Sequence, residues 1–409
     1  MVTIDRIPSK ARAFFRPLRN QFSQAAWDHF WGLVLAMCIS HGTTVERLAG
    51  LLRRSTHRTN HGEFYWRSHW DESAVLQAIA LDTLKRLHRK KDRRVFFILD
   101  DTQTLKRAKK MDAVGKLFHH ATGKYGQGHT ILKACLYCRG VTIPWGSWIY
   151  IKKEQAKGLQ QPFRKLTELA AEAIRQASIP EHFNVTVLFD AFYLCPRVVC
   201  ACRQRHWHFI GVGKSNRRFT VGSLSHKLGR YGRNLLRRRV QCCTIQGLRK
   251  RRTYRFTARV GHLSKVGTVK VVFSRRPGER NLVALVTDQL GTSARGIVAA
   301  YLKRWAIELL IKDEKQHLGL GDYRVRRYQA VVRHLHLVDI AYACLTHVGL
   351  TAARVQGQQT QTKNELRLEP IRQLKERMHR MFWQDAVQDV VKHSHEKPVI
   401  RRLEKLLAA

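Results

Sequence analysis

Two aspartates in this 409-residue chain follow short apolar runs. Residues 95–99 (VFFIL) precede Asp100, and residues 185–189 (VTVLF) precede Asp190. Such runs indicate buried strands, and ligands of open α/β sheets bind where strands leave the sheet. Carboxylates at that edge can hold Mg²⁺ together with solvent and phosphate oxygens. Strand-end aspartates also commonly make turns or cap helices, so neither residue alone indicates a metal site.

A third carboxylate lies on a helix predicted over residues 292–318. At 100° per residue, four polar side chains of this largely apolar helix fall within an arc of about 60°: Tyr301, Arg304, Glu308 and Lys315. Trp305 and Ile307 flank this stripe, which argues against an ordinary solvated face. An ion pair between Glu308 and Lys312 would explain the glutamate, but neither Tyr301 nor Arg304.

The pattern Tyr-x2-Arg-x3-Glu-x6-Lys is complete in its spacing. It resembles the YREK signature of bacterial insertion-sequence transposases with a DDE triad. The sequence Asp-Asp-Thr at residues 100–102 and the run before Asp190 are also similar to that family, and the resemblance spans about residues 95–345. The resemblance implies an RNase H-like core whose Asp100, Asp190 and Glu308 hold two Mg²⁺ ions, with Mn²⁺ as a substitute.

The same resemblance assigns roles to the residues around the triad. Asp101 is the alternative first ligand, but Asp-x-Thr is common in the family, and Asp100 and Thr102 would share one face of the strand. Tyr301, Arg304 and Lys315 are expected to contact transposon-end phosphates. Hairpin-forming relatives hold a flipped base with a tryptophan of their insertion, and here that segment offers only Trp207.

The charge balance indicates a nucleic-acid partner. Lys and Arg number 75 against 30 Asp and Glu, which gives a formal net charge of +45, and a polyphosphate backbone is the usual partner of such a field. No acidic residue occurs in the 88 positions between Asp190 and Glu279. Two clusters in this stretch are expected to contact DNA: Arg237, Arg238 and Arg239, and Lys250, Arg251 and Arg252. A ribosome-associated or merely supercharged protein would show the same excess, but the apolar runs favour a folded nucleic-acid binder.

The order of strands and helices along the chain predicts an α/β fold. With the resemblance, the expected fold is an RNase H-like mixed sheet flanked by helices, with a β-rich insertion and a helical N-terminal domain. Residues 1–90 are helical and either bind DNA or simply cap the core. Residues 91–204 and 282–350 form the catalytic core. Between them, residues 205–281 form a basic insertion of short strands, beginning at residues 207–212. Residues 351–409 form a Gln-rich linker and a basic helical tail.

Nine cysteines, an odd number, and the lack of a signal peptide favour a reducing cytosol. Cys135 and Cys138 lie within an apolar run, and Cys200 and Cys202 lie near two histidines, His206 and His208. Zinc is a weak interpretation, and core cysteines are favoured. No apolar run reaches the roughly 18 residues of a membrane span. A cytoplasmic, nucleoid-associated bacterial protein without a membrane partner is therefore expected.

Taken together, these features predict a DNA transposase that cleaves transposon ends and joins the freed 3′-hydroxyl to target DNA. The expected partner is double-stranded DNA, and synapsis of two ends favours a homodimer. Two alternatives stay open: an RNase H-like endonuclease without strand transfer, and a non-catalytic DNA-binding protein derived from a transposase.

Overall fold

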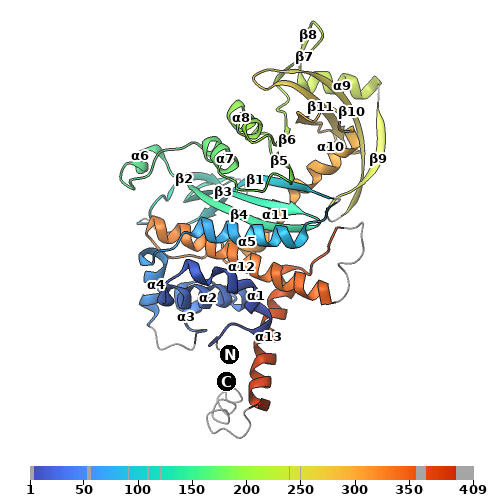
Figure 1. The fold of residues 1–409 in the computed structure, drawn as a ribbon. Helices are drawn as coiled ribbons and strands as arrows, with labels where there is room; N and C mark the ends of the chain where they lie inside the picture. Colours follow the sequence, from blue (N-terminus) through green and yellow to red (C-terminus); the bar gives the residue numbers. More distant parts are fainter. Residues whose placement is uncertain are drawn as a thin grey trace.

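The computed structural model describes residues 4–52, 57–90, 92–107, 110–119, 122–238, 240–248, 250–355 and 365–392. Its architecture is mixed α/β, as predicted, with one mixed sheet (Figure 1). The strand order is β2-β3-β1-β5-β6-β12-β11-β10-β7-β8, with β4 paired to β3 and β9 paired to β10. The strands are β1 (Arg94–Leu105), β2 (Gly115–His119), β3 (Lys124–Cys138), β4 (Val141–Tyr150), β5 (Asn184–Phe189), β6 (His208–Val212), β7 (Arg218–Val221), β8 (Leu224–Lys227), β9 (Gln241–Gln246), β10 (Arg251–Leu263), β11 (Gly267–Arg275) and β12 (Val283–Thr287).

The centre of the sheet is built from the apolar runs. β1 pairs antiparallel with β3 and parallel with β5, and β5 pairs parallel with β6. Both faces are covered, because Phe97 and Val187 lie in one hydrophobic cluster whereas Ile98 and Leu188 lie in the other. Burial on both faces explains why these strands read as continuous apolar runs instead of alternating ones.

The first strand is longer than predicted. β1 continues past Asp100 to Leu105, because its pairing with β3 runs on to Leu105 and Gly128. Its pairing with β5, by contrast, ends at Ile98 and Leu188. The prediction that the strand ends at Asp100 is therefore wrong for one edge of β1 and correct for the other. The prediction for β5 is confirmed, since that strand ends at Phe189.

The segment predicted as the insertion differs from expectation in two ways. Its first predicted strand, now β6, pairs in parallel with β5 and belongs to the centre of the sheet. Helix α9 (Leu228–Arg238) was not predicted at all. Two glycines lower its helix propensity, yet one of them, Gly232, allows the helix to approach the sheet. A Cβ there would come within 2.2 Å of the Phe273 ring.

The helix predicted over residues 292–318 is interrupted. It forms α10 (Ala294–Tyr301), the 3₁₀ turn η3 (Leu302–Arg304) and α11 (Trp305–His317). A 3₁₀ turn has three residues per turn instead of 3.6, so a constant 100° per residue does not relate Tyr301 to Glu308. Trp305, which was expected to flank the polar stripe, is half exposed at 50%.

The remaining helices lie on the two sides of the sheet and beyond its edges (Figure 1). The N-terminal region is helical, as predicted, and α5 and α12 pack against β4. The helices are η1 (Ser9–Ala11), α1 (Arg12–Phe15), η2 (Arg16–Gln21), α2 (Gln24–Ile39), α3 (Val45–Ala49), α4 (Arg58–Arg67), α5 (Glu72–Leu87), α6 (Lys153–Ala156), α7 (Leu166–Arg175), α8 (Pro196–Gln204), α12 (Tyr328–Val355) and α13 (Ile371–Lys392). The glutamines of the predicted linker, residues 356–361, lie outside the described residues.

Helix α12 is the one described helix whose length and composition would suit a membrane span. Most of it is buried inside the protein, where it packs against α2, α5, α13 and β4. These contacts identify it as a core helix.

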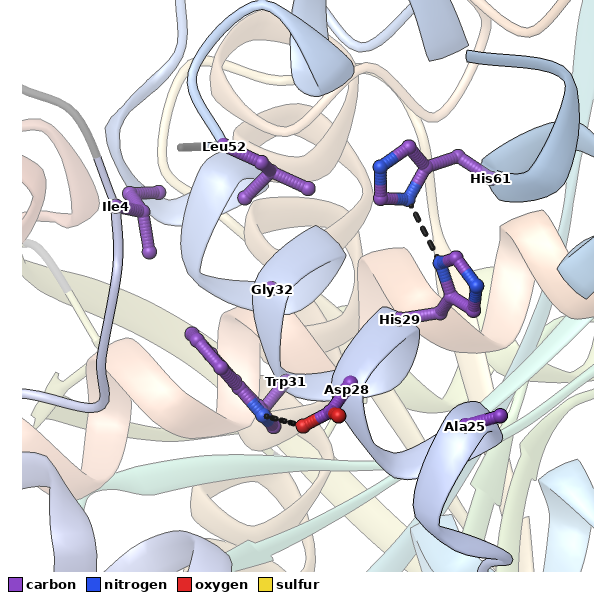
Figure 2. A pocket seen from close by; sticks show the side chains of 8 residues that line it. All are labelled: Ile4, Ala25, Asp28, His29, Trp31, Gly32, Leu52 and His61. Atoms are coloured by element: carbon purple, nitrogen blue, oxygen red, sulfur yellow. Dashed lines mark hydrogen bonds between the residues drawn. The ribbon is translucent and has the colours of Figure 1, made fainter. Parts of the chain in front are cut away.

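A pocket lies among the N-terminal helices (Figure 2). Ile4, Leu52, Trp31 and Gly32 contribute to its wall, and His29 and His61 approach each other with 2.9 Å between their Nδ1 atoms. None of the residues predicted to do chemistry lines this pocket.

Candidate active site

Asp100 and Asp190 occupy equivalent positions just past the end of the β1–β5 pairing. The last parallel pair of β1 and β5 joins Ile98 to Leu188, and each aspartate follows two residues later on its own chain segment. Because side chains alternate along a strand, Asp100 points to the same face as Ile98. The end of the β1–β5 pairing therefore brings the two carboxylates near each other, and the charge of Asp190 contributes to the raised pKa of Asp100.

Arg304 joins the third carboxylate to the first. Its guanidinium donates one hydrogen bond to Asp100 Oδ2, at 2.8 Å, and another to Glu308 Oε1. All three side chains are largely shielded from solvent. The ion pair of Glu308 is thus with Arg304, one turn earlier, instead of with Lys312. The structure brings Asp100 and Glu308 together through a shared cation.

The Asp190 carboxylate is fixed by the turn that follows β5. Its Oδ1 accepts hydrogen bonds from the backbone N–H groups of Phe192, at 2.8 Å, and Tyr193, at 3.4 Å. This is the turn-forming role that strand-end aspartates often have. The contact uses one carboxylate oxygen and orients the side chain at the edge where Asp100 lies.

Asp101 faces the other way. The Tyr193 hydroxyl donates a 2.9 Å hydrogen bond to Asp101 Oδ1, and the Asp101 backbone N–H donates to Asp100 Oδ1. Adjacent strand residues point to opposite faces. Of the two neighbouring aspartates, Asp100 is the one on the side of Arg304 and Glu308.

Burial, together with neighbouring charges, shifts the pKa values of the acidic groups at this site. Burial raises the pKa of Asp100 to about 6, the nearby Arg304 opposes this shift, and the charges of Asp190 and Asp101 add to it. The pKa of Glu308 is also raised by burial, against the effect of Arg304. Burial likewise raises the pKa of Tyr301 to about 12. A site that raises carboxylate pKa values favours an added positive charge.

The donor chemistry fits a hard divalent cation. Carboxylate oxygens are the ligands that Mg²⁺ and Mn²⁺ prefer. Across the described ranges, no three His, Cys, Asp or Glu side chains converge closely enough to form a ready-made metal cluster. Arg304 accounts for part of this spacing, because its guanidinium lies between Asp100 and Glu308. A cation at these oxygens would have to replace Arg304.

Two other residues of the predicted stripe lie around this site. Tyr301 ends α10, and the Arg304 guanidinium lies 5.9 Å from its ring centre. Lys315 is exposed in the last turn of α11, and its Nζ donates a 2.9 Å hydrogen bond to the Gln103 carbonyl of β1. Lys315 therefore bonds to the strand that carries the first carboxylate, at a position three residues past Asp100.

The two basic clusters do not converge. Arg237 and Arg238 are exposed at the end of α9, whereas Lys250, Arg251 and Arg252 are exposed where β10 begins. Arg239 lies outside the described residues. β9 runs between the two clusters, from Gln241 to Gln246, so they are separated by roughly 17 Å along this strand.

Three buried residues behind the site were not predicted. Lys133 Nζ lies 2.6 Å from Asp339 Oδ1 and 2.8 Å from Glu314 Oε2, and none of the three side chains is exposed. The Ser147 hydroxyl donates to the second oxygen of Asp339. Lys133 is also the register partner of Asp100 on β3. A lysine in the middle of an apolar strand was the sequence signal for this cluster.

The cysteines and the tryptophan that the sequence analysis considered as site residues lie mostly in the core. Cys135, Cys138 and Cys202 are buried, which confirms them as core cysteines, whereas Cys200 is exposed. Trp207 is buried and lies 5.7 Å from Phe97, ring centre to ring centre. It is therefore a core residue and does not present its ring to a flipped base.

A comparison with known protein families shows the family of the chain. Residues 17–258 match the family described as DDE superfamily endonuclease. The match includes Asp100 and Asp190 and ends before Glu308. No curated protein matches the chain. Because the matched segment covers more than half of the sequence, the chain belongs to the DDE superfamily of endonucleases.

Proposed function

We propose that this DDE endonuclease is a transposase, which cleaves the ends of a mobile element and joins the freed 3′-hydroxyl to target DNA. The observation that carries the proposal is the Arg304 bridge between Asp100 and Glu308. It supports the triad of Asp100, Asp190 and Glu308, because it links a carboxylate beyond the family match to one inside it. The strand order β4-β3-β1-β5-β6 supports the RNase H-like core.

The proposed reaction needs few groups of the protein. Asp100, Asp190 and Glu308 would hold two Mg²⁺ ions, for which Mn²⁺ can substitute, and such ions activate the attacking oxygen and stabilise the leaving one. Arg304, released from its two carboxylates, would turn to a DNA phosphate, which a guanidinium can bind through two parallel hydrogen bonds. Lys315 and Tyr301 would position the same strand. The turn that holds Asp190 keeps its second oxygen available.

The remaining assignments are part of the same proposal. The exposed clusters Arg237–Arg238 and Lys250–Arg252 would contact DNA phosphates outside the catalytic centre. The part of residues 205–281 that follows β6 would act as a basic insertion, and residues 1–90 would act as a DNA-binding domain or helical cap. Pairing of two transposon ends would require a homodimer. The protein would work on the bacterial nucleoid in the cytoplasm.

The test is a plasmid assay with the purified protein. The substrate carries the coding sequence with its native flanking DNA, and reactions contain Mg²⁺, Mn²⁺ or EDTA. Metal-dependent cleavage at the borders, followed by joining of the excised fragment to a second plasmid, is the expected result. Cleavage without joining would instead support the endonuclease without strand transfer.

Two variants separate catalysis from binding. Asp190→Asn should abolish cleavage and leave DNA binding intact, because it removes a ligand charge without changing shape. Asp101→Asn is the matched control, since that carboxylate accepts its hydrogen bond from Tyr193 on the other face, and it should retain cleavage. Salt-sensitive binding without cleavage in either metal would overturn the proposal in favour of a non-catalytic DNA-binding protein.

A further inference from the structure

The β2–β3 hairpin extends the face of the sheet on which Asp100 lies. Asp100 is opposite Lys133 on β3, and Tyr125 lies eight residues before Lys133 on the same strand. Positions an even number of residues apart share a face, so Tyr125 and Asp100 point to the same side. At about 3.3 Å per residue, Tyr125 lies about 26 Å from the level of Asp100.

Two aromatic rings are exposed at the end of this face. Phe118 on β2 is the register partner of Tyr125, and their ring centres are 5.3 Å apart in an edge-on arrangement. Tyr125 is 70% exposed and Phe118 is 39% exposed. Nearer the catalytic centre, the same face is covered, because His129 is buried beneath Tyr323. The aromatic pair lies beyond that cover.

The charge of the hairpin complements a polyanion. No acidic residue occurs in the 41 positions between Asp112 and Glu154. Lys116 is exposed on the same face as the rings, and its Nζ lies 5.1 Å from the centre of the Tyr125 ring. Exposed aromatic rings beside a cation form a stacking platform for nucleic-acid bases, which accepts any base because each has a π-face.

The position of the hairpin in the sheet indicates which part of a bound DNA would lie near it. In Figure 1, β2 lies at one end of the sheet and the β9–β10 arch at the other, with β1 and β5 between them. DNA bound at Asp100 and Asp190 would thus leave the site in two directions, toward the acid-free β9–β10 region and toward the hairpin. At 3.4 Å per nucleotide, the hairpin lies seven to eight nucleotides from the scissile phosphate, roughly.

We propose that the β2–β3 hairpin is a further DNA contact, at which Tyr125 and Phe118 stack on unpaired bases of the strand beside the cleavage site and Lys116 binds its phosphate. The proposal rests on the proposed function in one respect only, that DNA occupies the face of Asp100.

The test is a binding titration in EDTA, so that cleavage does not interfere. One probe is a fully paired duplex, and the other is the same duplex with a short single-stranded 3′ extension. Tyr125→Ala should weaken binding to the extended duplex about tenfold, as expected for loss of one stacked base, and change binding to the paired duplex little. Tyr125→Phe should retain the affinity of the wild type. Lys116→Gln should reduce the slope of log affinity against log salt by about 1.

Two control variants and three possible results distinguish failure of the hairpin proposal from failure of the proposed function. Trp383→Ala removes an exposed aromatic residue of α13, and Lys85→Gln removes an exposed charge of α5; neither should alter either titration. Equal affinity of Tyr125→Ala and wild type for the extended duplex would overturn the hairpin proposal alone. Preference for the same extension made of RNA would also overturn it. If the wild type binds neither DNA, both proposals fail.

Discussion

The positively charged Arg304 side chain lies between the carboxylates of Asp100 and Glu308, where it compensates their charge. Asp100 and Glu308 are carboxylates largely shielded from solvent, and each accepts a hydrogen bond from the same guanidinium. Arginine suits this role because its planar fork offers several donors in fixed directions. The same fork suits a phosphate. Arg304 is therefore expected to exchange partners, from carboxylates without metal to DNA once metal is bound.

Replacement of Arg304 should have opposite effects on metal binding and on cleavage. In Arg304→Gln, a metal no longer competes with the guanidinium, so Mn²⁺ affinity should rise about tenfold, or about 1.4 kcal/mol, in line with the usual worth of hydrogen bonds to charged groups. Cleavage should fall because a phosphate contact is lost. Paramagnetic resonance titration with Mn²⁺ measures the first effect. Weaker Mn²⁺ binding would show instead that Arg304 organises the carboxylates for the metal.

Metal binding should also depend on pH. The raised pKa of Asp100, about 6, means that the folded protein holds a proton there below pH 6, and a metal must displace it. Affinity for Mn²⁺ should therefore fall about tenfold per pH unit below 6 and be nearly constant above 7. An aspartate with an ordinary pKa would show no change in this range. Asp101→Asn should retain the dependence, and a flat profile from pH 5 to 7 would contradict the assignment.

At the scale of elements, α11 is held to the sheet by a buried ionic cluster. Lys133 of β3 lies between Glu314 of α11 and Asp339 of α12. Two carboxylates share one ammonium, and burial, together with the charge of Asp339, raises the pKa of Glu314 well above its ordinary value. This shift favours the protonated form of Glu314, against the opposing charge of Lys133. The cluster fixes the helix that carries Glu308 opposite the strand that carries Asp100.

Two substitutions test this description. Lys133→Met leaves buried carboxylates without a cation and should lower the free energy of unfolding by about 3–5 kcal/mol. Glu314→Gln imitates the protonated acid and should cost less than about 1 kcal/mol. Chemical denaturation measures both. Arg94→Ala, which breaks the exposed pair with Asp92, should change stability by about 1 kcal/mol at most. A large cost for Glu314→Gln would show that Glu314 is ionised.

The elements also show what a sequence can and cannot predict. The runs before Asp100 and Asp190 identified two central strands because burial on both faces leaves a continuous apolar pattern. Helix spacing likewise placed Arg304 near Glu308, because residues four positions apart are neighbours on a helix. The extension of β1 to Leu105 was not predictable in this way. Its polar Thr104 is buried by Tyr323, a residue more than 200 positions away.

At the scale of the whole molecule, the C-terminal segment contacts residues at or next to both ends of α11, the helix of Glu308. Glu365 accepts hydrogen bonds from Lys303, beside Arg304, and from the Tyr137 hydroxyl of β3. Lys375 of α13 donates to the His317 carbonyl at the end of α11 and to two carbonyls at the end of α2. A segment at the far end of the chain thus links the N-terminal helices to the helix of Glu308.

Loss of the Lys375 ammonium should therefore loosen α11 from a distance. Lys375→Met keeps the apolar stem but leaves buried helix-end carbonyls without a donor, which should cost about 1–3 kcal/mol of stability. Amide exchange in the last turn of α11 should accelerate and metal-dependent cleavage should slow, whereas DNA binding in EDTA should be unchanged. Arg372→Ala, which breaks an exposed pair on the same helix, is the matched control. If exchange in α11 stays as slow as in the wild type, the C-terminal segment stabilises α13 alone, and the position of Glu308 depends on the Lys133 cluster.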